Sequence, residues 1–339
     1  MALGTLLLPT LSLAAEGVSR GAAAQTTVAS GGDTLLLVEK VASKLVFLDP
    51  DTGDRRAEVA LPQFPHEFVV DRANRHAFVA HYGLESSDKV GEGGTDVVVV
   101  DLLERRVVHS LECAPFNRLH GIGLDEKGRL TVLSEEKGVL VSFDDPVGAK
   151  QPSAAANTGG IKTHLFSLSR DGERAWVTGL LSNTVSLIRP RDASVAPVVT
   201  RVGTFPEGNC LSPDEKTLYV GNRRSGSVTM LDADTLKVRA TREVGGDPVR
   251  LYAMADGRLL LLNLAGESAS LLKPDMSNIW TMKLGAKPAG ASLHPTAARA
   301  FISLASDEVL TVDLETQRVE RRFKTGAGAD VTRWLPAAG

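Results

Sequence analysis

Short runs of apolar and β-branched residues alternate with polar turns along most of this chain. The clearest unit runs from Pro206 to Pro248, where segments 217–221, 227–232 and 237–243 are rich in β-forming residues and are separated by Asn, Asp, Ser and Gly. Such runs, bounded by turn residues, predict short strands. Between the runs we find no segment of about 10 to 15 residues with helical periodicity, which argues against a parallel α/β fold.

The same unit recurs with a period of about 42 residues, which is typical of a propeller blade with four strands. Pairs of second and third strands recur at 76–80 with 96–101, 130–134 with 139–143, 175–178 with 184–188, 259–262 with 268–272, and 300–303 with 308–313. Equivalent positions near the start of each unit are spaced by 54, 44, 43, 42, 40 and 41 residues, and they are His66, His120, His164, Glu207, Val249, Ala289 and Asp330.

The two ends of the repeat array complete one further blade. Segments 35–39 and 45–49 have the pattern of a second and a third strand, whereas the chain ends with a lone first strand at 330–335. We therefore predict an all-β, seven-bladed β-propeller over residues 31–339, with four antiparallel strands per blade and with the N-terminal strands pairing with the C-terminal strand. This closure removes free sheet edges. A β-sandwich is the alternative, but its strands do not recur at this period.

One blade carries a family resemblance. The segment Leu218-Tyr219-Val220-Gly221-Asn222, followed by 227–232 and by Val244-Gly245-Gly246-Asp247-Pro248, resembles the YVTN repeat of bacterial seven-bladed propellers, a superfamily that includes the lactonase-like propellers. The resemblance covers residues 34 to 335. Its members include lactone hydrolases, cycloisomerases, lyases and exported proteins with no assigned reaction, so it implies a fold and leaves the chemistry open.

The N-terminal residues resemble the end of a secretory signal, with an apolar stretch from Leu3 to Leu13 followed by Ala14-Ala15 but without a positively charged segment before it. We expect residues 1–30 to be a signal-like leader and flexible N-terminus, and the protein to be periplasmic or secreted. No stretch reaches the roughly 20 apolar residues of a membrane-spanning helix, so we expect no transmembrane segment. Cys113 and Cys210 lie about two repeats apart and are expected to be unpaired.

Composition excludes several classes of function. The 339 residues are 43% hydrophobic and 23% charged, which indicates a folded chain. Lys and Arg number 38 against 41 Asp and Glu, so there is no basic excess or aromatic–basic stripe for nucleic acid. The chain also lacks a phosphate-binding loop, a dinucleotide fingerprint and a nucleophile elbow. We therefore expect no nucleotide cofactor, and covalent serine or cysteine catalysis is unsupported.

Histidines gather at one repeat position. Three of the seven histidines, His66, His120 and His164, occupy consecutive equivalent positions, followed by Glu207, and Asp330 holds the same position in the closing blade. In a propeller these positions form a ring at one mouth of the channel. Neutral imidazoles with a carboxylate suit Zn, Cu, Mn or Fe, which would act as a Lewis acid or activate water. The predicted ligands are His66, His120, His164 and Glu207.

A metal-free site is the alternative, with a histidine as general base, a glutamate as its partner and an arginine as an anion clamp. Purely structural histidines that cap loop carbonyls are a third interpretation. An insertion at 83–95, which explains the spacing of 54, is either a lid or a tolerated surface excursion. The catalytic candidates are His66, Glu67, Glu207 and Arg250. The ligand-binding candidates are His81, Tyr82, Glu135, Asn222, Arg223, Asn263 and Asp330. Nearly all of them come from loops between second and third strands, which are expected on the face where the first strands begin.

The sequence thus predicts a propeller that holds a small polar ligand at one channel mouth. As an enzyme it would be a metal-assisted hydrolase or lactonase, a lyase or an isomerase. The alternative is a non-catalytic platform that binds a ligand or a protein partner, a frequent use of propellers. The two hypotheses differ in one respect: a platform would keep its binding when the three ring histidines are changed to alanine.

Overall fold

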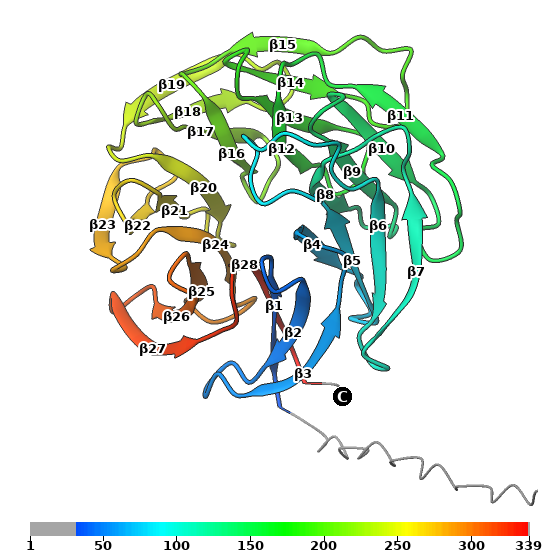
Figure 1. The fold of residues 1–339 in the computed structure, drawn as a ribbon. Helices are drawn as coiled ribbons and strands as arrows, with labels where there is room; N and C mark the ends of the chain where they lie inside the picture. Colours follow the sequence, from blue (N-terminus) through cyan, green and yellow to red (C-terminus); the bar gives the residue numbers. More distant parts are fainter. Residues whose placement is uncertain (1–31, 338–339) are drawn as a thin grey trace, which may run out of the picture. The chain divides into compact units, whose positions relative to one another are not determined.

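The computed structural model describes residues 32–337, which form seven four-stranded antiparallel sheets arranged around a central channel (Figure 1). This confirms the predicted seven-bladed propeller. None of residues 32–337 lies in a helix, and this part of the chain has no helix that is long and apolar enough to cross a membrane. The signal-like leader falls outside the described residues.

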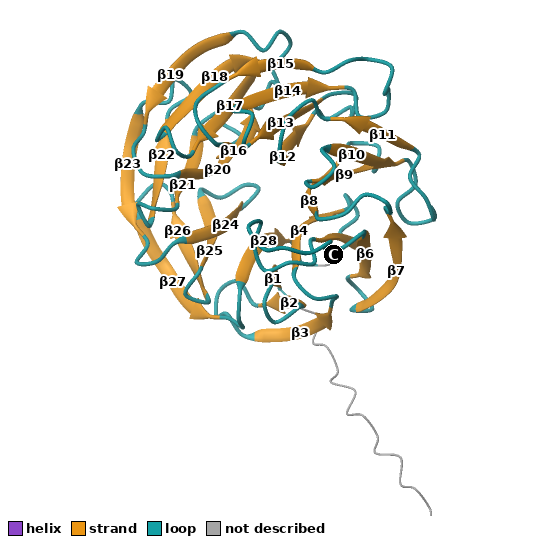
Figure 2. Ribbon diagram, turned by 45° about the horizontal axis from the view of Figure 1, so that its top comes forward, coloured by secondary structure: helices purple, strands orange, loops and turns teal. Residues whose placement is uncertain are grey.

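Each sheet runs from an innermost strand at the channel to an outermost strand at the rim (Figures 1 and 2). In that order, the first blade contains β28 (Ala329–Leu335), β1 (Thr34–Glu39), β2 (Lys44–Leu48) and β3 (Arg55–Ala60), and the second contains β4 (Pro65–Val70), β5 (His76–His81), β6 (Asp96–Asp101) and β7 (Arg106–Glu112). The third blade contains β8 (Leu119–Leu124), β9 (Leu130–Ser134), β10 (Val139–Phe143) and β11 (Ala154–Asn157). The fourth contains β12 (Thr163–Leu168), β13 (Ala175–Gly179), β14 (Thr184–Ile188) and β15 (Val198–Arg201). The other three are β16 (Pro206–Leu211), β17 (Thr217–Asn222), β18 (Ser227–Asp232) and β19 (Val238–Glu243); β20 (Pro248–Ala253), β21 (Leu259–Asn263), β22 (Ser268–Leu272) and β23 (Asn278–Lys283); and β24 (Pro288–Leu293), β25 (Arg299–Leu304), β26 (Glu308–Asp313) and β27 (Arg318–Lys324).

The ring closes through the first blade. Strand β28, near the C-terminal end of the chain, pairs with β1 in antiparallel register, with Leu36 opposite Arg333 and Leu37 opposite Thr332. The predicted join of three N-terminal strands with one C-terminal strand is therefore confirmed. As a result, β1 has a partner on both sides and presents no free edge.

The core lies between successive sheets. Second strands such as β13 and β21 are buried at every position because each sheet packs face to face against its neighbours, whereas the rim strands β19 and β27 are mostly exposed. The buried Trp176 of β13 joins the cluster of the next blade, and its indole N–H donates to the carbonyl of Ala233 at 2.8 Å. Continuous apolar runs therefore stabilise the contacts between blades.

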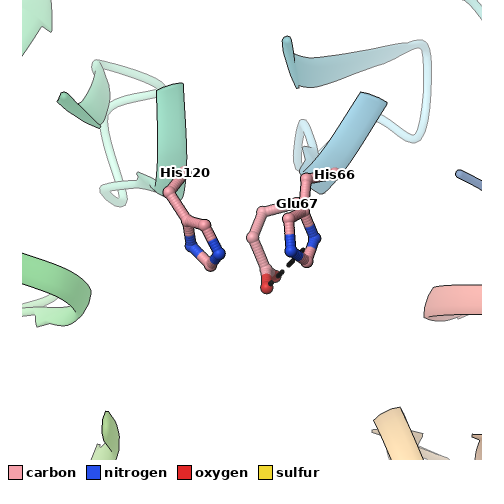
Figure 3. A group of neighbouring side chains, drawn as sticks. All are labelled: His66, Glu67 and His120. Atoms are coloured by element: carbon pink, nitrogen blue, oxygen red, sulfur yellow. Dashed lines mark ion pairs between the residues drawn. The ribbon is translucent and has the colours of Figure 1, made fainter. Parts of the chain in front are cut away.

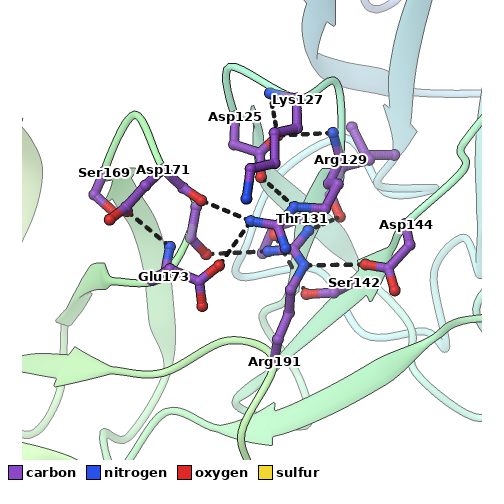
Figure 4. A network of polar contacts seen from close by, with 12 residues as sticks. Asp125, Lys127, Arg129, Thr131, Ser142, Asp144, Ser169, Asp171, Glu173 and Arg191 are labelled. Atoms are coloured by element: carbon purple, nitrogen blue, oxygen red, sulfur yellow. Dashed lines mark hydrogen bonds and ion pairs between the residues drawn. The ribbon is translucent and has the colours of Figure 1, made fainter.

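A polar network joins the third and fourth blades at the end of β8 opposite to His120 (Figure 4). The Asp125 carboxylate, with no exposed side-chain surface, accepts the Arg129 Nε–H at 2.6 Å and the backbone N–H groups of Lys127 and Arg129 at 2.9 Å. The same guanidinium donates to the carbonyl of Asp171 at 2.6 Å and to Glu173 Oε1 at 2.8 Å, both in the next blade.

The substitution Asp125→Ala is expected to lower the free energy of unfolding by about 3 kcal/mol, because it leaves a guanidinium and two backbone N–H groups without their acceptor. Urea denaturation measures this change. Glu173, whose side chain is 48% exposed, provides the control. Glu173→Gln should cost about 0.5 kcal/mol or less. Equal losses for the two variants would contradict the role assigned to Asp125.

Candidate functional site

The predicted ring register is confirmed. The seven equivalent positions are each the second residue of an innermost strand, so they lie at the same end of the channel. They are His66 in β4, His120 in β8, His164 in β12, Glu207 in β16, Val249 in β20, Ala289 in β24 and Asp330 in β28.

A left-handed residue precedes five of these strands. The residue just before β4, β8, β12, β16 and β28 has a positive φ between 50° and 77°, in a region that residues other than glycine rarely adopt. The recurrence of this turn sets a common entry direction for the inner strands. It thereby brings the ring residues to a common place at the channel mouth. The five residues are Phe64, Arg118, Lys162, Phe205 and Gly328.

The three imidazoles form a row. The ring centroids of His66 and His120 lie 4.3 Å apart, and those of His120 and His164 lie 3.9 Å apart. Figure 3 shows His66, Glu67 and His120 pointing into the same space. The buried ring of Tyr82 packs edge-on against His66 and His120, at 5.8 and 5.4 Å. Side chains that are far apart in the sequence therefore meet as the repeat predicted.

Burial lowers the pKa of two of these imidazoles. His120 is 1% exposed, and its desolvation, together with the neighbouring imidazoles, places its pKa well below the usual value. Burial also lowers the pKa of His66, against the opposing effect of Asp330. The Nδ1 atom of His120 is buried and has no hydrogen-bond partner among residues 32–337. Its environment suits a lone pair that is available to a ligand.

Carboxylates flank both ends of the row. Asp330 Oδ2 lies 2.7 Å from His66 Nδ1, although the two atoms are not aligned for a hydrogen bond. Burial opposes ionisation of Asp330, but His66 overcomes it and lowers the carboxyl pKa to about 2. At the other end, Glu135 pairs with His164 Nδ1 at 3.0 Å and accepts the Tyr82 hydroxyl at 3.2 Å. Despite burial, the contact with His164 lowers the pKa of Glu135.

Two arginines hold the remaining glutamates. Arg250 donates to Glu67 Oε1 at 2.5 Å, while its own Nε is buried without a partner among the described residues. Arg223 donates to Glu207 Oε2 at 2.6 Å and, through two nitrogens, to Asp247 at 2.6 and 2.7 Å. Glu207 Oε1 lies 3.6 Å from His164 Nε2. Glu207 is therefore near the row but is engaged by Arg223.

Three of the predicted ligand-binding residues make their contacts elsewhere. His81 pairs with Asp96 at 2.8 Å at the base of the insertion. Asn222 donates to Ser227 and Thr229 of its own blade, at 3.2 and 2.9 Å, and Asn263 contacts Ser270 of its own blade at 3.5 Å. None of these hydrogen bonds reaches an imidazole of the row. Cys113 and Cys210 are both free, as predicted.

Two lysines complete the site and were not predicted. Lys40 Nζ lies 5.4 Å from the Tyr82 ring centroid, and burial lowers the pKa of this lysine. Lys162 Nζ lies 3.8 Å from Glu135 Oε1. Lys40 belongs to the turn between β1 and β2, the second and third strands of the first blade. In other blades, the equivalent loops carry predicted ligand-binding residues such as Glu135. The repeat pattern could therefore have identified Lys40 as a further candidate.

The insertion at 83–95, in the blade of β4 to β7, contacts the next two blades along the chain. Its backbone carbonyls accept hydrogen bonds from Asn117 Nδ2 at 2.6 Å, from Arg118 at 2.8 Å and from Lys162 Nζ at 2.8 Å. Asn117 and Arg118 immediately precede the strand that carries His120, and Lys162 lies just before the strand that carries His164. The insertion is therefore bound next to the strand starts that hold two of the imidazoles.

Two groups of side chains in this row have the composition and spacing of a metal site. In each group the ligand atoms all lie within 4.8 Å of one another. The three imidazoles are thus divided between two groups that share His120, and each group uses a glutamate other than Glu207. The groups are His66, Glu67 and His120, and His120, Glu135 and His164.

No family model matches the chain. It is 24% identical over 255 residues to the uncharacterized protein YncE of Salmonella typhimurium, across 71% of this chain and 69% of that protein. One solved structure with the same fold is the periplasmic gluconolactonase PpgL of Pseudomonas aeruginosa, which is 16% identical, covers 91% of this chain and 100% of that chain, and has a TM-score of 0.72. Another is Kuenenia stuttgartiensis hydrazine synthase, which is 16% identical, covers 92% of this chain and 100% of that chain, and has a TM-score of 0.68. The chain therefore has a seven-bladed propeller fold with a lactonase among its structural neighbours.

Proposed function

We propose that the chain binds a divalent transition metal at the channel mouth through the imidazole row and its neighbouring carboxylates, and uses it to hydrolyse an ester or lactone bond of a small polar substrate. The observation that carries the proposal is the row itself, in which the Nδ1 of His120 is buried without a partner. Leaving such an atom unsatisfied costs about 1–3 kcal/mol, and a bound cation offsets that cost.

The charges around the row favour a cation. Glu67 and Asp330 lie within 4.0 Å of an imidazole nitrogen of His66, and Glu135 and Glu207 lie within 4.0 Å of an imidazole nitrogen of His164. The nearby basic side chains, Arg223 and Arg250, donate to Glu207 and Glu67. The buried environment screens these charges less than water would. An anion alone would therefore meet a less favourable site than a divalent cation.

The residues at the mouth suit hydrolysis. A metal held there supplies Lewis acidity toward a carbonyl and a bound water of lowered pKa. Asp330 and Glu135 hold His66 and His164, as outer carboxylates do for histidine ligands. The unpaired Nε–H of Arg250 is a donor for the carbonyl oxygen as negative charge develops on it. Water then adds to the carbonyl carbon, the ring C–O bond breaks with a proton passing to the alcohol oxygen, and the product leaves as a hydroxy carboxylate and one proton.

The preference for a lactone or an ester rests on two similarities, namely the YVTN-type repeat and the fold shared with a gluconolactonase. Export to the periplasm or beyond the cell is part of the proposal. It is supported by the apolar stretch from Leu3 to Leu13.

Metal removal tests the proposal. We expect untagged protein to contain a divalent metal by elemental analysis and to accelerate proton release from D-glucono-1,5-lactone in a pH-stat. Dialysis against a chelator should return the rate to the spontaneous level, and one of zinc, copper, manganese or iron(II) should restore it. Bound metal without hydrolysis of lactones or esters would favour the non-catalytic platform.

A metal-free hydrolase is the second candidate, and a specific observation favours it. The pair His164–Glu135 has the arrangement of a general base with a carboxylate that orients it through a hydrogen bond of 3.0 Å. The same experiment separates the candidates. Hydrolysis at the full rate after complete removal of metal would support the metal-free site and contradict the metal-assisted one.

A further inference from the structure

We propose that the channel mouth holds two metal ions, one on each side of His120. This inference rests on the proposed metal site and extends it from one ion to a pair. The first ion has His66, Glu67 and His120 as ligands, and the second has His120, Glu135 and His164. Figure 3 shows the side chains of the first group, which converge on one space from β4 and β8.

The spacing of the donor atoms favours two ions over one ion shared by all three imidazoles. Nitrogen and oxygen ligands lie about 2.0–2.2 Å from a zinc-sized ion, so two ligands of the same ion are separated by at most about 4.4 Å. Within each group the donor atoms lie within 4.8 Å of one another, so small side-chain shifts complete either site. Among residues 32–337, no group with this spacing contains both His66 and His164.

His120 is placed to serve both ions. Its ring lies between the other two, with centroid distances of 4.3 and 3.9 Å, and an imidazole carries nitrogens on two different edges. Its side chain is almost completely buried, and its Nδ1 has no hydrogen-bond partner among the described residues. Coordination through both nitrogens requires release of the ring N–H proton to solvent, which the two positive ions favour.

Each ion also receives one carboxylate of its own. Glu67 has a 13% exposed side chain beside His66 and Arg250. Glu135 uses Oε2 for His164 and Tyr82, whereas its Oε1 is buried without a hydrogen-bond partner among residues 32–337. Every ion therefore meets two nitrogen donors and one negative charge, with the remaining positions left to water or substrate. Because the carboxylates differ, each ion can be removed separately.

Zinc stoichiometry tests this pair. Untagged full-length protein is loaded with excess zinc, passed through a desalting column and measured by elemental analysis. We expect two zinc ions per chain in the unaltered protein, one in Glu67→Gln, one in Glu135→Gln and none in His120→Ala. Glu207→Gln is the control and should retain two, because neither group includes that carboxylate. Far-UV circular dichroism checks that each variant keeps its β structure.

Copper(II) reports whether the ions are adjacent. Two copper ions joined through one imidazole couple magnetically, so the ordinary single-ion signal in electron paramagnetic resonance should be weak in the fully loaded protein and strong in either glutamine variant. Two ions without coupling, or a glutamine variant that keeps both, would overturn the pair. One zinc ion per chain in the unaltered protein would also overturn it while leaving the proposed function intact, whereas no bound metal would contradict both.

Discussion

Replacing His120 by alanine is expected to abolish metal binding and to lower kcat/KM for D-glucono-1,5-lactone by about a thousandfold. His120 belongs to both candidate metal groups, so its loss leaves each with one imidazole and one carboxylate. A bound metal contributes several kcal/mol to stabilising charge in the transition state, and each 1.36 kcal/mol corresponds to about tenfold in rate. Metal analysis and pH-stat kinetics on the same preparations measure both effects.

His76→Ala is the matched control for His120→Ala. His76 lies on β5, and its Nδ1 pairs with Asp71 at 2.9 Å, so the ring takes no part in either metal group. Metal content and kcat/KM should be unchanged in this variant. Retention of both metal and activity in His120→Ala would instead assign the imidazole row a structural role. The propeller architecture would be unaffected by that result.

The fold could be predicted from the sequence because its information is local and repeated. Each blade presents the same succession of apolar strands and polar turns, and a period of about 42 residues needs four strands to a blade. Closure followed from the unmatched strands at the two ends, which the structure joins as β28 and β1. The ring position of His66, His120 and His164 followed from the same register, because the second residue of every inner strand lies at one mouth.

The detailed pairing of the site could not be predicted, because it depends on side-chain directions that the repeat does not specify. Glu207 was expected among the metal ligands, whereas the groups of ligand atoms that lie closest together contain Glu67 and Glu135. Asn222 was expected at the ligand, but it donates to hydroxyls within its own blade. Lys162 lies just before an inner strand in a left-handed conformation, and although Gly159 and Gly160 precede it, nothing in the sequence marks the lysine itself as the left-handed residue.

Ending the chain after Gly328 is expected to prevent folding of the propeller, because this truncation removes β28. That strand is the innermost of the first blade, and its buried residues include Ala329, Thr332 and Leu335. Without it β1 loses one hydrogen-bonded neighbour along its length and presents a free edge that promotes aggregation. Domains of this kind are stable by only about 5–15 kcal/mol, which the loss of a whole inner strand exceeds. We expect no cooperative unfolding transition in urea.

A chain that ends after Pro336 is the control, because it keeps all of β28 and, among the described residues, loses only the exposed hydrogen bond from the Ala337 N–H to Asp33. Its unfolding free energy should be within about 0.5 kcal/mol of that of the full chain. A synthetic peptide of residues 329–337 should restore a cooperative unfolding transition to the chain that ends after Gly328. The peptide supplies β28 as a separate molecule, and this strand can pair with β1 in the same register. A cooperative transition of the shorter chain without the peptide would mean that six complete blades and three strands hold the ring on their own, and that closure contributes little to stability.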